Sequence, residues 1–357
     1  MPATAATAAT AAELESAVTD AVHEVVAMQH GAGIDVVSDG EMGKPGFVNY
    51  VRERLEGFGG HAAGWDLDDL AVAPELAMAQ YGGEAGAHIM AANCEGPVGY
   101  VGAAAAARDI ETLRRALDGT GHSGTGDAFM PAASPGCIAT GSPNLHYPDY
   151  DTYLDAVADA MAHEYRAIVD AGLVLQLDCP DIPMAAHTGF WCRDEVRRRG
   201  VVGFAERHVA AVDRALEGID PSRVRLHLCW GNYEGPHHFD APLSELLPPV
   251  LAGRPGMVSF EAANPRHEHE WEDVASLTIP DDKVLVPGVV DTLTNIVEHP
   301  RLVAQRLQRF ADVVGPDRVV ASTDCGFGTF VGFGRVGLQV AEMKLQAIAE
   351  GAALVRA

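Results

Sequence analysis

Basic residues are scarce in this sequence. It holds 25 Lys and Arg against 50 Asp and Glu in 357 residues, a formal net charge of −25 at pH 7. Nucleic-acid-binding proteins concentrate Lys and Arg against phosphates, so this balance argues against a nucleic-acid partner. It argues equally against docking on an anionic membrane surface. Most of the acidic side chains are therefore expected on a solvated surface.

Long apolar runs and a disulfide framework are missing as well. No apolar stretch approaches the roughly 18 residues that span a bilayer. The six cysteines are scattered along the chain, unlike those of small disulfide-rich secreted domains. The opening MPATAATAATAA has neither the basic start nor the strongly apolar centre of a signal peptide. We expect a cytoplasmic protein with reduced thiols, whose residues 1–12 form a disordered, low-complexity N-terminus.

Apolar residues, in contrast, are plentiful at 48% of the chain, and short apolar runs alternate with amphipathic helical patterns. This alternation is typical of a parallel sheet covered on both faces. Seven strong strand candidates and a weaker eighth at 97–102 favour a (β/α)₈ TIM barrel over a doubly wound sheet. The strong candidates are residues 34–41, 127–136, 173–181, 224–230, 257–263, 284–292 and 319–326.

One domain accounts for the pattern. We expect residues 13–357 to form a single barrel, with a Gly-, Ala- and His-rich excursion at about 57–127. No G-x-G-x-x-G motif follows the early strands, and GFGTFVGFG (326–334) lacks the helix that should follow such a motif. A dinucleotide site is therefore not expected.

Nearly every strand candidate ends in a side chain that can do chemistry. In a barrel the carboxyl ends of the strands and the loops after them form the active-site face. Residues far apart in sequence should therefore meet at one mouth. These residues are Glu41, Ser134, Asp178, His227, Cys229, Glu261, Asp291 and Cys325.

The spacing of His227 and Cys229 predicts a metal site. Residues i and i+2 of a strand point to the same side, so both side chains can face the barrel axis. With Glu261 and Cys325 they make a set of two thiolates, one imidazole and one carboxylate, which suits Zn²⁺. Such an electron-rich zinc favours binding a substrate thiol as a thiolate, with Glu261 as the ligand most easily displaced.

A plainer interpretation stands beside this one, because a buried cysteine is usually a small hydrophobic residue and a histidine at a strand end is often only hydrogen-bonded. Other candidates carry less chemistry. His237 and His238 fall in a loop, and the run 267–270 resembles a solvated helix start. The remaining cysteines have no nearby histidine in the sequence and are expected to be structural; they are Cys94, Cys137, Cys179 and Cys192.

The motifs at the strand ends resemble those of the cobalamin-independent methionine synthase family, specifically its zinc-bearing C-terminal barrel in a short form. The resemblance spans residues 31 to about 335. The matching segments, in the family's order, are GIDVVSDGE, SPG, LQLDCPD, HLCW, SFEAA, VPGVVDT and STDCG.

This resemblance implies roles for the strand-end residues. Glu41 and Asp178 match carboxylates that hold the amino group of homocysteine, although each could otherwise be a loop or turn acid. Ser134 is a weaker substrate-binding candidate, because it could equally form the turn before Pro135. Asp291 is the candidate catalytic residue. The zinc ligands implied are His227, Cys229, Glu261 and Cys325.

The sequence also departs from the family. Leu293 stands where family members carry a histidine, and CIATGSP (137–143) replaces a tryptophan-bearing stretch near the folate site. The family's first strand has no counterpart in MPATAATAATAA, so either the barrel lacks that strand or 97–102 fills the gap. The methyl donor therefore stays open among a folate, a methylated corrinoid on a partner protein and a small methylated compound.

Three functions follow from these residues. The first is a zinc-dependent methyltransferase acting on the thiol of homocysteine or a similar small molecule. The second keeps the zinc but alkylates another thiol, in the manner of epoxyalkane:coenzyme M transferase. The third is a non-catalytic family member, which the missing first strand favours because an unclosed barrel exposes sheet edges.

Overall fold

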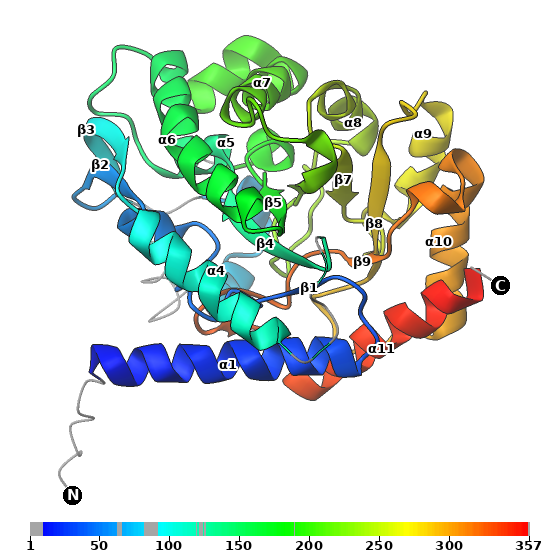
Figure 1. Cartoon of the computed structure of the whole chain (residues 1–357). Coiled ribbons are helices and arrows are strands. Elements are labelled where there is room, and N and C mark those ends of the chain that lie inside the picture. The colour runs from blue at the N-terminus through cyan, green and yellow to red at the C-terminus, as the bar shows by residue number, and fades with distance from the viewer. Residues whose placement is uncertain are drawn as a thin grey trace, which may run out of the picture.

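The computed structural model describes residues 10–62, 66–81, 92–118, 120, 124, 126–188 and 190–355. Within this part of the chain, the central feature is a curled sheet of seven strands in the order β1-β4-β5-β6-β7-β8-β9, with every neighbouring pair parallel (Figure 1). This confirms the TIM-barrel-like fold predicted from the sequence. The strands are β1 (Val37–Ser38), β4 (Ala128–Ala133), β5 (Val174–Asp178), β6 (Val224–Leu228), β7 (Met257–Phe260), β8 (Val284–Val290) and β9 (Ser322–Thr323).

Helices cover the outside of this sheet (Figure 1). The first begins inside the segment expected to be disordered. The Thr10 hydroxyl caps it by accepting a hydrogen bond from the Glu13 amide, and the Thr10 backbone N–H donates to the Glu13 carboxylate. The expectation of disorder at residues 1–9 lies outside the described residues. The helices are α1 (Ala11–Gly31), α2 (Pro74–Tyr81), α4 (Ala103–Leu117), α5 (Pro135–Gly141), α6 (Tyr150–Asp170), α7 (Arg193–Ala215), α8 (Leu243–Ala252), α9 (Trp271–Ser276), α10 (Pro300–Val314) and α11 (Leu338–Val355). None of the described helices is long and apolar enough to cross a membrane.

The strand predicted at 97–102 does not enter the barrel. It belongs to β3 (Asn93–Tyr100), which pairs antiparallel with β2 (Leu55–Gly59) in a separate sheet. The idea that it replaces the first barrel strand is therefore wrong. The physical reason is burial: most β3 residues are half-exposed, whereas β6 is buried at every position, as a covered barrel strand requires.

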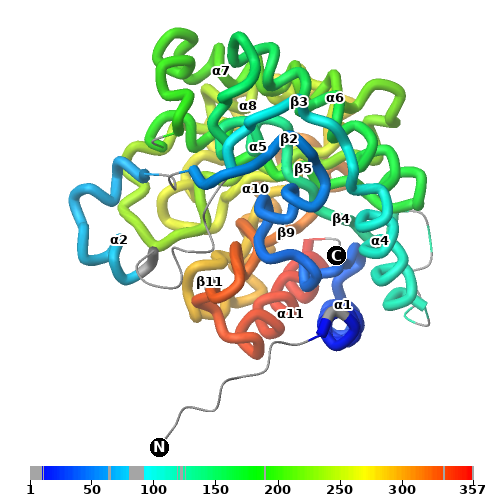
Figure 2. The backbone as a smooth tube through the Cα atoms, turned by 90° about the vertical axis from the view of Figure 1, so that its left-hand side faces the viewer, coloured from blue at the N-terminus to red at the C-terminus, as the bar shows by residue number. Residues whose placement is uncertain are grey.

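The two ends of the sheet stay apart in the described residues, since β1 pairs only with β4 and β9 only with β8. The first and last helices lie side by side at this gap (Figures 1 and 2). Gly33, just after α1, approaches α11 so closely that an added Cβ would lie 3.2 Å from the Cβ of Ala349. Helix packing thus covers the place where an eighth strand would close the barrel.

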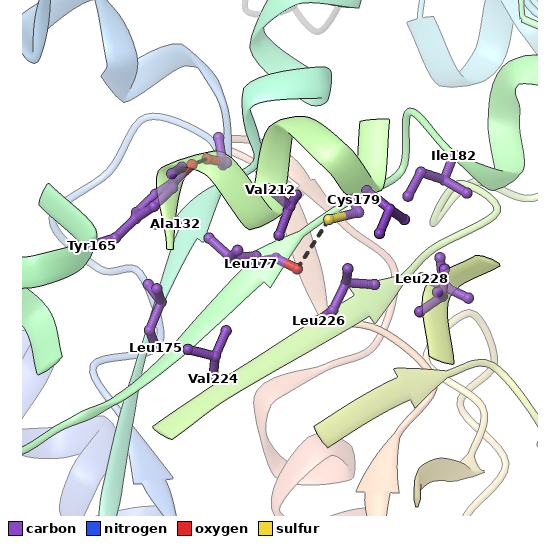
Figure 3. Close-up of a cluster of buried hydrophobic side chains, with 14 of the residues drawn as sticks. Ala132, Tyr165, Leu175, Leu177, Cys179, Ile182, Val212, Val224, Leu226 and Leu228 are labelled. Atoms are coloured by element: carbon purple, nitrogen blue, oxygen red, sulfur yellow. Dashed lines mark hydrogen bonds between the residues drawn. The ribbon is translucent and has the colours of Figure 1, made fainter. Parts of the chain in front are cut away.

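Alternate residues of the central strands divide between core and lumen. Leu175 and Leu177 of β5 and Leu226 and Leu228 of β6 are fully buried against the surrounding helices (Figure 3). Since successive strand residues face opposite sides, the residues between them face the barrel interior. The apolar half of each strand therefore anchors it, at about 1.5–3 kcal/mol per buried leucine, and the other half is free to build a site.

Candidate metal centre

A cavity of about 1140 Å³ runs along the lumen of the barrel. It reaches from Asn232 and Phe330, beyond the carboxyl ends of the strands, to Arg223 and Met257 at their amino ends. Its wall includes side chains of α1 and α11, because none of the described strands lies between β1 and β9. The polar residues that line it include Glu41, Lys44, Asp178, His227, Cys229 and Cys325.

Three predicted metal ligands meet at the mouth of this cavity. One ligand atom from each of His227, Cys229 and Cys325 lies within 4.8 Å of the other two. The two sulfur atoms are 3.2 Å apart, and both cysteines are free thiols. His227 and Cys229 come from the end of β6, and Cys325 follows β9. Two thiols and one imidazole in such contact form a donor set that suits zinc.

The protonation state of His227 supports this assignment. Burial, with a smaller contribution from the positive Arg225, lowers the pKa of His227 to about 3. The imidazole is therefore neutral at physiological pH, which is the form that binds a metal. Its Nδ1 lies 3.3 Å from the Ser259 hydroxyl, a contact that orients the ring.

Glu261 lies beside the group of three. Its Oε1 is 3.4 Å from the sulfur of Cys325 and accepts a hydrogen bond from the Trp230 amide at 2.8 Å. Its Oε2 accepts a hydrogen bond from the side chain of Asn264 at 2.8 Å. Burial raises the pKa of the Glu261 carboxyl. Glu261 is therefore close enough to serve as a fourth donor after a small movement. In the structure its carboxylate oxygens accept hydrogen bonds from Trp230 and Asn264.

Asp324 fixes the loop that carries Glu261. Its two carboxylate oxygens accept the backbone N–H groups of Ala262, Ala263 and Asn264, each at 2.9 Å. Burial, together with the negative charge of Glu261, raises the pKa of Asp324 to about 7. Asp324 therefore acts on the site by holding the loop, and its oxygens are occupied.

The two predicted amino-group carboxylates, Glu41 and Asp178, both line the cavity. Glu41 follows β1 with a left-handed φ of 55°, a conformation supported by the Asp39 carboxylate, which accepts its amide at 3.0 Å. Burial and the negative charge of Glu41 raise the pKa of Asp178 to about 7. Lys44 Nζ lies 3.1 Å from the Glu41 carboxylate. The arrangement forms a negative pocket in which only part of the charge is neutralised.

The structure does not bring the side chains of Ser134 and Asp291 to the described lining of the cavity. The Ser134 hydroxyl caps α5 by accepting the Cys137 amide at 2.9 Å, and it donates to Asp181 at 2.8 Å. Asp291 accepts the Leu293 amide at 2.8 Å. The Ser134 hydroxyl and one carboxylate oxygen of Asp291 thus have structural partners in the protein.

A cluster of buried histidines was missed by sequence reasoning. His237 lies in the predicted loop and His267 directly precedes a short helix, but neither is solvated: both are buried, each with a ring nitrogen 2.9 Å from the Asp240 carboxylate. His238 is exposed, as a loop residue should be. The signal that could have revealed the cluster is a repeated spacing, His-x-x-Asp at 237–240 and His-x-x-Glu at 267–270. We call it the Asp240 cluster; its members are His187, His237, Asp240, His267 and Glu270.

The chain is similar to known proteins in sequence and in fold. No family model matches the chain. A methionine synthase of Saccharolobus solfataricus is 24% identical over 348 residues, which cover 96% of this chain and 86% of that protein. A 2-hydroxypropyl-CoM lyase of Xanthobacter autotrophicus is also 24% identical, over 183 residues that cover 43% of this chain and 46% of that protein.

A solved structure is similar over nearly the whole chain. It is that of a B12-independent methionine synthase from Shewanella sp. W3-18-1 in complex with selenomethionine. The TM-score is 0.71 at 21% identity, covering 98% of this chain and 90% of that chain. This likeness shows a shared fold. Together with the sequence match to short methionine synthases, it confirms the resemblance to the short form of the cobalamin-independent methionine synthase family that the strand-end motifs predicted.

Proposed function

We propose that the protein is a zinc-dependent methyltransferase that methylates the thiol of homocysteine in methionine biosynthesis. The observation that carries this proposal is the meeting of His227, Cys229 and Cys325 at the mouth of a cavity that also presents two carboxylates. The relatives named methionine synthase support it. The proposal assigns zinc to His227, Cys229 and Cys325, with Glu261 as the fourth and weakest donor.

Zinc held by these residues would lower the pKa of a bound thiol and present its sulfur as a nucleophile. The protein supplies the rest of the arrangement. His227 is held neutral by burial and oriented by Ser259. Glu261 has alternative partners in the Trp230 amide and Asn264, so it can give up its place to a substrate sulfur without becoming an unsatisfied buried charge.

Glu41 and Asp178 would hold the ammonium group of homocysteine. Burial raises the pKa of Asp178, and the negative charge of Glu41 raises it further; an ammonium between the two carboxylates would counteract both effects. Asp178 ends β5, and Glu41 lies in the turn after β1 that the Asp39 carboxylate stabilises. With the ammonium held between them, they would also fix the direction in which the substrate carbon chain leaves the sulfur.

Two of the three candidate methyl donors remain to be compared. A corrinoid-protein donor finds no support, since the solved relative is a B12-independent enzyme. Methyltetrahydrofolate and a small methylated compound are the two donors to compare in assays. The residues on the folate side, Leu293 and 137–143, differ from the family's pattern and make this comparison necessary.

A second function is alkyl transfer to a different thiol. The match to the 2-hydroxypropyl-CoM lyase, which covers less than half of either chain, motivates this candidate. Such an alkyl transfer would use the same metal-binding residues with another electrophile. Turnover of homocysteine compared with 2-mercaptoethanesulfonate separates the two candidates.

X-ray absorption at the zinc edge tests the proposal. We expect about one zinc per chain, and a rise in the number of sulfur ligands from two to three when homocysteine is added. Cys192→Ala, which removes a buried cysteine outside the metal group, should behave as the wild type, whereas Cys229→Ser should lose a sulfur ligand. A protein without zinc, or a zinc shell that homocysteine leaves unchanged, would contradict the proposal.

A further inference from the structure

One arginine lies in the lumen of the barrel. Arg225 stands on β6 two residues before His227, on the same face of the strand. It lines the cavity and is only 8% exposed. Its guanidinium carbon lies 4.0 Å from the centre of the Phe129 ring, which lines the same cavity. A buried guanidinium is costly unless hydrogen bonds or a counter-charge compensate it.

The protein satisfies only one of its nitrogen atoms. Arg225 Nε donates to Gln176 Oε1 at 2.7 Å, and Gln176 Nε2 donates to Asp178 at 2.8 Å. The Gln176 amide therefore stands between the guanidinium and the nearest carboxylate and fixes both. Among the described residues, neither terminal nitrogen of Arg225 has a hydrogen bond or an ion pair, and neither is fully buried. A fork of N–H donors is left for a group in the cavity.

The other described cations of the cavity wall are placed differently. Lys44 donates to Glu41 and, at 2.6 Å, to the carbonyl oxygen of Pro131. Arg223 donates through Nη2 to the carbonyl oxygen of Gly172, and its Nε is buried without a hydrogen-bond partner. In Arg225 it is instead the two terminal nitrogens, neither of them fully buried, that lack an acceptor among the described residues. Such a fork matches the two oxygen atoms of a carboxylate or sulfonate.

We propose that Arg225 binds the anionic group, a carboxylate or sulfonate, of the thiol substrate. This inference rests on the proposed function, because it places the sulfur at His227, Cys229 and Cys325. Residues i and i+2 of a strand are about 7 Å apart, which a thiol with its anionic group two or three carbons from sulfur can bridge. In an amino-acid thiol, Glu41 and Asp178 face the ammonium while Arg225 faces the carboxylate.

Calorimetric titration tests the inference. Zinc-loaded wild type, Arg225→Met and Arg225→Lys are titrated with homocysteine, 2-mercaptoethanesulfonate, uncharged 2-mercaptoethanol and sodium sulfate. Arg223→Met is the matched control, since it removes another cavity arginine. We expect Arg225→Met to weaken both anionic thiols on the order of 10- to 100-fold. Binding of 2-mercaptoethanol should not change, the control should match wild type, and Arg225→Lys should lose less because it keeps the charge without the fork.

Each other outcome decides against one proposal or the other. Equal binding of the anionic thiols by wild type and Arg225→Met overturns the anion site. If Arg225→Met also loses binding of 2-mercaptoethanol, the role of Arg225 is structural, and this outcome overturns the anion site too. If wild type binds no thiol, the proposed function fails, and the sulfate titration tests the anion site alone. Sulfate binding by wild type that is lost in Arg225→Met supports the anion site. No sulfate binding by wild type overturns it. If Arg225→Met does not fold, Arg225→Lys decides by the same comparison.

Discussion

Two buried sets of histidines and acids lie close together in this protein, and their chemistry differs. In the metal group (His227, Cys229 and Cys325) the donors face one another: the sulfur atoms are 3.2 Å apart, and the His227 ring lies 3.3 Å from the Ser259 hydroxyl. In the Asp240 cluster, Asp240 Oδ2 lies 2.9 Å from both His237 and His267, and His267 also pairs with Glu270. The histidine of the first group thus has no carboxylate partner among the described residues, whereas His237 and His267 of the second do.

The same residue type therefore takes opposite protonation states. Burial lowers the pKa of both His227 and His267, but the hydrogen bonds from His267 to Asp240 and Glu270 outweigh burial and raise its pKa to about 10. For His227 no carboxylate counteracts burial, and its pKa falls to about 3. A buried histidine without an acidic partner is available to a metal, while one between two acids is a fixed cation.

The strongest way to break this comparison is to remove a metal donor. We expect His227→Asn to lower the zinc content from about one per chain to below about a tenth, because the site would lose its imidazole donor. Elemental analysis of the purified protein measures this. His238→Asn, at an exposed histidine nearby, should keep its zinc. A zinc content of about one per chain in His227→Asn would contradict the assignment of zinc to His227, Cys229 and Cys325.

The Asp240 cluster should instead carry stability. Asp240→Asn takes away the charge that three histidines face, and we expect the free energy of unfolding to fall by about 3 kcal/mol. Urea denaturation of wild type and variant measures the change. The exposed Asp282→Asn should stay within about 0.5 kcal/mol. A variant as stable as wild type would show that the cluster does not hold the loops together.

The cluster also predicts a pH dependence. The pKa of His267 is about 10 in the folded protein, against 6.5 for an ordinary histidine. The folded state therefore binds the extra proton, so its contribution to stability is complete below about pH 6.5 and is lost as the pH rises to about 10. We expect the unfolding free energy of wild type to fall more steeply between pH 7 and 10 than that of His267→Gln. Parallel slopes would contradict the assignment of a buried imidazolium.

The smallest expected effect is that of replacing Ser134, which tests whether this residue belongs to the substrate pocket. Ser134→Ala should lower stability by about 1 kcal/mol, because α5 loses its cap and Asp181 loses a hydrogen bond. The affinity for homocysteine, measured by calorimetry, should not change. A weaker affinity with unchanged stability would instead return Ser134 to the substrate pocket that the sequence resemblance implied.

The sequence was informative where periodicity sets geometry. The alternation along a covered strand placed His227 and Cys229 on one face, and the order of strands brought Cys325 beside them. It failed where burial depends on distant loops. The His-x-x-Glu spacing at 267–270 hints at a paired histidine but does not establish that His267 is buried. Its burial depends on distant residues: Trp230, whose ring centre lies 4.2 Å from that of His267, and Asp240. The prediction that residues 97–102 form a barrel strand failed for the same reason. The pairing of β3 with β2, and not the apolar content of β3, decides where this strand lies.

The gap between β1 and β9 has a consequence for biosynthesis. The wall of the lumen there is built by α1 and α11, the first and last helices of the described chain, and the metal group takes Cys325 from its final quarter. Ribosomes deliver a chain from its N-terminus, so a nascent chain that ends before residue 338 has an open lumen whatever its other strands have done. The cavity is therefore completed after synthesis of nearly the whole described chain. The three candidate metal ligands can likewise meet only after Cys325 has been synthesised.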